Sequence, residues 1–130
     1  MRRRREGASA IEAALALPVL LVLLFAILDW SWYLFEWLTV VRSAHAGVRL
    51  AVGVEASADP ESVATGAVEQ ALEAYGIPAD SATIDVVLAE DVLTVDVRVD
   101  FQALVGVIPT PDQLHARTEA AWYGGVFEGT

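Results

Sequence analysis

The feature that most constrains this chain is a run of sixteen residues without a charged side chain, residues 13–28, which follows a basic N-terminus. As an α-helix this run would be about 24 Å long, somewhat less than the ~30 Å thickness of the apolar part of a bilayer. The mean hydropathy of the chain, +0.49, is high for a soluble domain and fits a membrane anchor joined to a small soluble part. The sequence therefore predicts a single membrane-spanning helix that needs the aromatic residues after it to complete its length.

Four arginines, Arg2, Arg3, Arg4 and Arg5, precede the apolar run and make up half of the eight basic residues of the chain. One interpretation is that they are an ordinary solvated charge run. We favour a topological one, because arginine and lysine next to a membrane segment keep that end of the segment on the cytoplasmic side. The expected topology has the N-terminus in the cytoplasm and the C-terminus outside it.

Aromatic residues follow the apolar run. We predict that four of them form the outer interfacial belt: Trp30, Trp32, Tyr33 and Trp37. Tryptophan and tyrosine favour the headgroup level, where the ring is buried and its polar tip stays hydrated. Asp29 and Glu36 are seven residues apart in the same stretch and hence on one face of the helix. Two interpretations of this pair stay open: the side chains are exposed at the interface, or they face a partner helix.

A glycine and a glutamate mark the border between the basic leader and the apolar run. Cleavage of the Gly7–Ala8 bond would create a cationic α-amine on Ala8, and Glu12 comes four residues later. A carboxylate in apolar surroundings is costly unless it is paired, so the amine of a neighbouring subunit is a suitable partner and would set the register between helices. Gly7 is expected to leave the backbone extended just before the helix begins. Ser9 is a plausible N-cap, with Glu12 completing a capping box.

The N-terminal part of the chain resembles the TadE-like proteins of the tight-adherence (Flp) pilus system, over about residues 2–52. The features that carry the resemblance are the basic leader, Gly7, Glu12, the Leu17-Pro18 pair, the Asp29-Trp30 pair and the segment 46–51.

This resemblance implies a type IV pilin-like minor pilin or pseudopilin that acts in pilus assembly and adhesion. It implies that a prepilin peptidase cuts between Gly7 and Ala8, and that Glu12 sets subunit register. The implied partners are the peptidase, the membrane, which the chain crosses once, and other pilin or pseudopilin subunits. The implied location is the bacterial inner membrane, with the C-terminal head in the periplasm, or the pilus after assembly.

The remainder of the chain predicts a small α+β head. Asp59 and Pro60 are a suitable cap and first residue for a helix that Gly76 ends. Three stretches of alternating apolar and polar residues then predict antiparallel strands, namely 82–88, 93–101 and 114–122, with a tight turn at Glu90-Asp91. The expected fold class is α+β, in which a long N-terminal transmembrane helix and a second helix accompany a small antiparallel sheet of about three strands. This is the pilin-like plan.

We expect three parts: a basic leader at residues 1–7, a transmembrane helix with its extension at 8–54, and an extracytoplasmic head at 55–130. The extension contains the small residues Ser43, Ala44, Ala46, Gly47 and Ala51. Small residues let helices approach closely, and here they predict either a stalk covered by the head or a contact surface for another helix.

Two other functions stay open. The chain could be an unprocessed single-pass protein whose periplasmic head is a binding module. It could instead be a secreted domain released after Ala46, because Ala44-His45-Ala46 resembles a signal-peptidase site. The apolar run is longer than a usual signal segment, which favours an anchor.

The sequence offers no chemistry typical of an enzyme. It has no cysteine, and its two histidines, His45 and His115, lie on different predicted elements. Asp96, Arg98 and Asp100 alternate with apolar residues and predict a solvated strand face. A net charge of −10 opposes binding to nucleic acid, whose affinity comes largely from phosphate neutralisation. We therefore expect no enzymatic activity, no metal site, no cofactor and no nucleic-acid partner.

Overall fold

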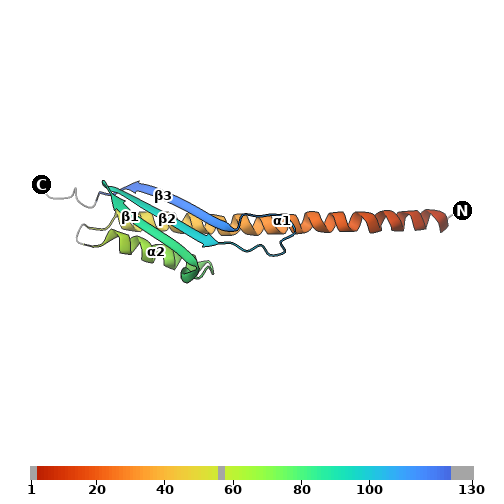
Figure 1. The fold of residues 1–130 in the computed structure, drawn as a ribbon, viewed down its shortest axis with the longest axis horizontal. Helices are drawn as coiled ribbons and strands as arrows, with labels where there is room; N and C mark the ends of the chain where they lie inside the picture. Colours follow the sequence, from red (N-terminus) through yellow and green to blue (C-terminus); the bar gives the residue numbers. More distant parts are fainter. Residues whose placement is uncertain (1–2, 56–57, 124–130) are drawn as a thin grey trace. The chain divides into compact units, whose positions relative to one another are not determined.

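The computed structural model describes residues 3–55 and 58–123, with side chains described from Gly7 onward. The elements follow the order α1 (Arg3–Val52), α2 (Pro60–Ala74), a short 3-10 helix η1 (Ala79–Ser81), β1 (Ala82–Ala89), β2 (Val92–Asp100) and β3 (Gln113–Ala121), as Figure 1 shows. The predicted α+β class, with a long apolar helix, a second helix and a three-stranded antiparallel sheet, is confirmed.

The chain divides into two compact units. The anchor unit contains α1 as far as Tyr33 together with the segment Ala103–Thr110 of the connection between β2 and β3. The head unit contains the rest of α1 from Leu34, α2 and the sheet. The anchor unit therefore includes a piece of chain that is far from the N-terminus in sequence.

The start of α1 differs from the prediction. The helix begins at Arg3 and continues through Pro18, so Gly7 and Ser9 lie inside it. The expected extended backbone at Gly7 and the expected cap at Ser9 are both wrong. The physical reason is that Arg and Glu are good helix formers, whereas one internal glycine costs only about 1 kcal/mol.

The bounds of α2 follow from local side-chain and backbone chemistry. The Asp59 carboxylate accepts a hydrogen bond from the Glu61 N–H at 3.2 Å, and a proline occupies the first helical position. At the other end, the N–H of Ile77 donates to the carbonyl of Leu72, and Gly76 adopts a φ of +83°. This is a Schellman ending, in which glycine takes the left-handed position. The predicted start and end of this helix are confirmed.

The sheet has the strand order β1-β2-β3, and both strand pairs are antiparallel. Glu90 and Asp91 connect β1 to β2, and both have a positive φ, 51° and 62°. Positive φ at both central residues is the pattern of the two-residue turn whose twist matches a hairpin. The predicted tight turn is confirmed.

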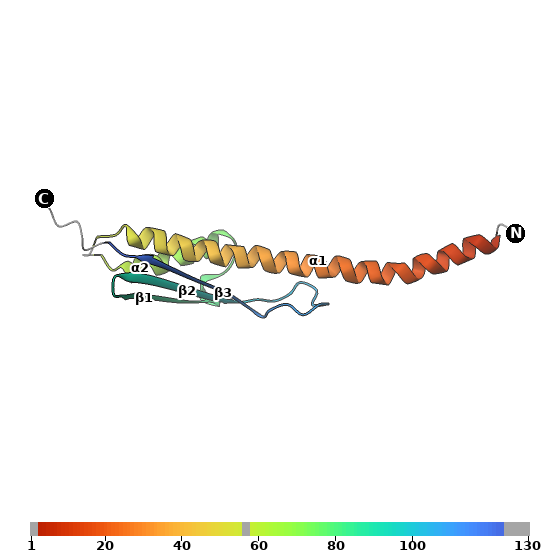
Figure 2. The same cartoon turned by 90° about the horizontal axis from the view of Figure 1, so that it is seen from above.

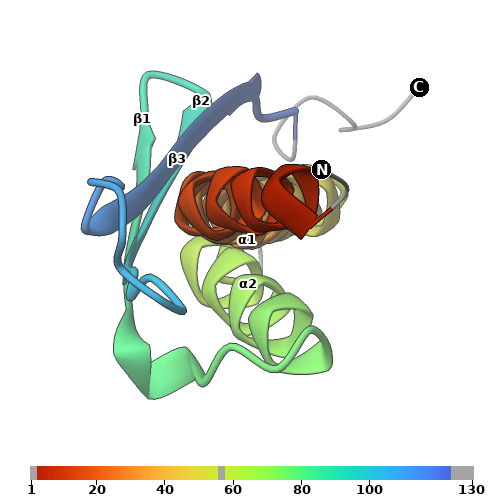
Figure 3. The ribbon, with the colours of Figure 1, turned by 90° about the vertical axis from the view of Figure 1, so that its right-hand side faces the viewer.

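The core of the head lies between the sheet and two helices. The C-terminal part of α1 and α2 lie on the same face of the sheet (Figure 3). The fully buried apolar side chains of this core include Val40, Ala44 and Ala51 from α1, Val68 and Leu72 from α2, and Leu93, Val95, Val97 and Leu114 from the sheet.

Gly47 sets how closely α1 and α2 approach. A Cβ built on it would lie 2.6 Å from Cγ2 of Val68 and 3.0 Å from the carbonyl oxygen of Ala64. Ser43, Ala44 and Ala51 are buried beside it in the same unit. The structure shows both interpretations of these small residues, because the head covers this part of α1 and Gly47 forms a close contact with another helix, α2.

Candidate functional site

The N-terminal part of α1 exposes its whole surface. Every described side chain from Gly7 to Leu24 is exposed, including Ala8 and Glu12. Arg2 lies outside the described residues, and Arg3, Arg4 and Arg5 are the first three residues of the helix. Glu12 is the single charged residue between Gly7 and Leu28, so this surface is apolar apart from one carboxylate and the hydroxyl of Ser9.

The aromatic residues after the apolar run are also on the surface. The exposed fractions of Trp30, Trp32 and Trp37 are 42, 37 and 40 %. The rings of Trp30 and Tyr33 contact each other edge to face, with their centroids 5.7 Å apart. The exposed apolar surface of the helix therefore continues past Leu28.

Asp29 lies between these apolar residues in the sequence, but it adds no charge to their surface because its side chain is completely buried. Its carboxylate accepts three backbone hydrogen bonds from the β2–β3 connection, which lies alongside α1 in Figures 1 and 2. Oδ1 accepts from the N–H of Val105 at 2.8 Å. Oδ2 accepts from the N–H of Gly106 at 3.0 Å and, at a longer 3.4 Å, from that of Val107.

Three consecutive amides that converge on one carboxylate form a backbone nest, which is a binding site for an anion. Gly106 has a φ of +72°, a backbone conformation that glycine adopts without strain. The Asp29 carboxylate is thus bound by three backbone N–H dipoles. We name this arrangement the Asp29 nest; its residues are Asp29, Val105, Gly106 and Val107.

The sequence did not predict the Asp29 nest. Both interpretations of Asp29, an exposed side chain and one that faces a partner helix, are wrong, because the carboxylate is buried against a loop of its own chain. One signal pointed to that loop: residues 101–111 contain no charged residue, although surface loops usually carry polar ones.

A second buried carboxylate lies in the head. Asp96 is 8 % exposed, and its Oδ2 lies 2.9 Å from Nε2 of His115. Its Oδ1 lies 3.1 Å from Nη2 of Arg98, whose Nη1 lies 3.8 Å from Oδ2 of Asp85. The prediction that Asp96 lies on a solvated face is wrong, because His115 on β3 and Arg98 on β2 cover it.

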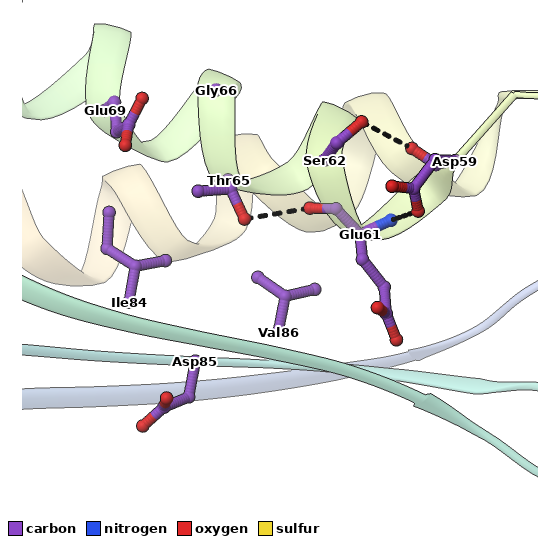
Figure 4. Close-up of a pocket in the computed structure, with 9 residues that line it drawn as sticks. All are labelled: Asp59, Glu61, Ser62, Thr65, Gly66, Glu69, Ile84, Asp85 and Val86. Atoms are coloured by element: carbon purple, nitrogen blue, oxygen red, sulfur yellow. Dashed lines mark hydrogen bonds between the residues drawn. The ribbon is translucent and has the colours of Figure 1, made fainter.

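An open groove lies between α2 and β1, and Figure 4 shows the residues that line it. Its polar groups serve the local structure. Asp59 caps the helix, and Glu61 accepts the N–H of Leu88 through Oε1 at 3.0 Å. The hydroxyl of Thr65 donates to the Glu61 carbonyl at 2.9 Å. Within residues 7–55 and 58–123, no group of three or more His, Asp or Glu side chains is arranged to hold a metal ion.

Comparison with known protein families gives a match to the N-terminal part of the chain. Residues 7–49, about a third of the chain, match the model of a family described as TadE-like protein. No curated protein matches the chain, and neither does any solved structure.

The match confirms the resemblance predicted from the sequence and supports a part in the tight-adherence pilus system. The matched segment contains Gly7, Glu12, Asp29 and Gly47, and it ends before α2 begins. Among the described residues, one helix is long and apolar enough to cross a membrane, and it lies within the span Gly7–Val52. The matched residues 7–49 and this helix cover the same part of the chain.

Proposed function

We propose, taking the TadE-like segment as the premise, that this protein is a minor pilin or pseudopilin in the assembly of a tight-adherence (Flp) pilus. In this proposal residues 1–7 are a leader that a prepilin peptidase removes after Gly7. Residues 8–54 anchor the protein in the bacterial inner membrane and extend into the head, and residues 55–130 form the periplasmic head. The four leader arginines keep the N-terminus in the cytoplasm.

The observation that carries this proposal is the surface of α1. Its described side chains are exposed from Gly7 to Leu24, and large apolar groups such as Leu15, Leu20 and Leu23 are 55–71 % exposed. Such a surface requires an apolar environment, which a bilayer supplies before assembly and the helices of other subunits supply after it. A helix that serves both environments is what an assembling pilin needs.

Glu12 gives this surface its one specific polar contact. Cleavage after Gly7 would leave a cationic amine on Ala8, and the carboxylate of Glu12 would be costly in apolar surroundings without a partner. Pairing the Ala8 amine of one subunit with Glu12 of the next satisfies both charges at one axial offset. Subunit register would therefore be set by electrostatics on a helix whose other contacts are non-directional.

The first prediction concerns the mature N-terminus. We expect the protein isolated from the membranes of its native host to begin at Ala8, as measured by intact mass and N-terminal sequencing. A Gly7→Val variant is expected to keep its leader, because a β-branched side chain would occupy the cut position. A Gly53→Ala variant is the control, since a Cβ there has no neighbour within 4 Å.

The other outcomes of this measurement point to different functions. A retained arginine leader in the wild-type protein would contradict the pilin proposal and favour an unprocessed anchored binding module. A start at Gly47 would favour a secreted domain, although that cut would remove the buried Val40 and Ala44 from the core of the head.

The second prediction concerns Glu12. We expect Glu12→Ala and Glu12→Gln to insert into the membrane and to be processed normally, yet to lose surface piliation and co-isolation with other pilin subunits. The physical reason is that both variants remove the charge that pairs with the Ala8 amine. Glu69→Ala, which removes an exposed acid from α2 in the head, is the matched control. Normal piliation by Glu12→Ala would rule out the register role.

A further inference from the structure

We propose that the segment Ala103–Thr110, which we name the nest loop, is a second membrane-contacting element that enters the lipid at the outer boundary of the bilayer beside α1. Asp29 holds it there. The proposal requires membrane anchoring only, and it is independent of processing at Gly7 and of any contact between subunits.

The first argument is the side-chain chemistry of the nest loop. It has no charged residue, and three of its apolar side chains point outward: Leu104, Val105 and Val107 are 61, 48 and 42 % exposed. A loop in water would gain from polar residues at such positions, whereas a loop at the acyl boundary gains from apolar ones. These three side chains belong to the same unit as the exposed apolar surface of α1, which they enlarge.

The second argument is the backbone. Irregular backbone exposed to lipid does not occur within the hydrocarbon region, so a loop can lie only at its boundary, and there it needs protein partners for the backbone groups that lose water. The Asp29 nest satisfies three consecutive amides of the loop, those of Val105, Gly106 and Val107. In return, the amides shelter a carboxylate that is completely buried. The nest therefore lowers the cost of placing these three amides and the carboxylate in an apolar environment.

The third argument is length. The charge-free run of residues 13–28 is about 24 Å long as a helix, which is short of the ~30 Å bilayer core. Once Asp29 is sheltered, the apolar span extends to Tyr33, over 21 residues or about 31 Å. Asp29 then lies four residues, or about 6 Å, inside the end of the span. A loop bound to it reaches the depth of 5–10 Å that is typical of interfacial apolar groups.

The test uses the absence of cysteine from the chain, because every introduced cysteine is then a unique label site. The full chain, with a nitroxide spin label at Leu104→Cys, is placed in vesicles of phosphatidylethanolamine and phosphatidylglycerol. Collision of the label with oxygen, which dissolves in lipid, is compared with collision with a water-soluble nickel complex. Leu28→Cys on the anchor and Val87→Cys on β1 of the head are the two references, since both positions are exposed.

We expect the label at Leu104→Cys to collide with oxygen preferentially, as the Leu28→Cys label does. Adding Asp29→Ala should shift the collision preference of this label toward the nickel complex, because the loop loses its attachment to α1. A nickel preference equal to that of Val87→Cys in the wild-type background would overturn the proposal. The proposal would also be overturned if the label collided weakly with both reagents and showed spin–spin broadening between copies. That result would assign the loop to a contact between subunits. If the label at Leu104→Cys still collides preferentially with oxygen when Asp29→Ala is present, the role of the nest would be overturned.

Discussion

Replacement of Asp29 by alanine is expected to release the nest loop and to speed hydrogen exchange of its amides roughly 100-fold. The carboxylate accepts three backbone hydrogen bonds and is completely buried, so its removal leaves three donors without an acceptor. Hydrogen bonds to charged groups contribute about 1.5–3 kcal/mol each, but bonds that share one carboxylate do not add fully. A net loss of about 3 kcal/mol corresponds to the stated factor, at about 1.4 kcal/mol for each tenfold change.

Hydrogen exchange of the full chain in detergent micelles, read from peptides that cover residues 102–111, measures this effect. Asp29→Asn keeps one acceptor oxygen and loses the charge, so we expect an intermediate rate. Asp80→Ala removes an exposed acid from η1 and should leave the loop unchanged. Equal exchange of the loop in wild type and Asp29→Ala would show that the nest does not hold it.

Replacement of Gly47 by alanine is expected to destabilise the head by about 2 kcal/mol, which for a domain of this size lowers the Tm by roughly 10 °C. The new Cβ would lie 2.6 Å from Cγ2 of Val68 and 3.0 Å from the carbonyl oxygen of Ala64. Valine is stiff at χ1 and the carbonyl belongs to α2, so neither neighbour yields without moving the helix. Thermal unfolding of the full chain in micelles, followed by circular dichroism, measures the shift.

Gly66→Ala provides a matched control for Gly47→Ala. Gly66 also lies inside a helix, α2, but a Cβ there has no neighbour within 4 Å. The same substitution should therefore stabilise the head by up to about 1 kcal/mol through helix propensity. Val68→Ala combined with Gly47→Ala should recover part of the loss, because it removes the closer contact. A stabilised Gly47→Ala variant would contradict the close approach of α1 and α2.

The sequence predicted those parts of the fold that depend on near neighbours. Asp59 and Pro60 start α2 through contacts within the first turn, and Gly76 ends it through its own backbone freedom. The Glu90-Asp91 turn likewise needs only the two strands that flank it. The start of α1 differs from the prediction for a related reason: the residues before Gly7 favour helix, and a single glycine does not interrupt it.

The candidate site was less predictable because its parts are distant in sequence. Asp29 and Val105 are 76 residues apart, and no periodicity within α1 reveals a partner in the β2–β3 connection. Asp96 shows the same difficulty for residues that are closer in sequence. Alternation along β2 placed it on the outer face correctly, but its burial depends on His115 from the neighbouring strand. Sequence patterns give the face of a strand, whereas tertiary neighbours decide whether that face meets water.

The hydrogen bond from Leu88 to Glu61 bears on how heads can associate. β1 is an outer strand of the sheet, and unpaired strand edges are common sites of strand addition between protein chains. An incoming strand at this end of β1 would have to displace the Glu61 carboxylate and leave its charge without that partner. The Glu61 carboxylate therefore opposes strand addition between copies at this end of the β1 edge.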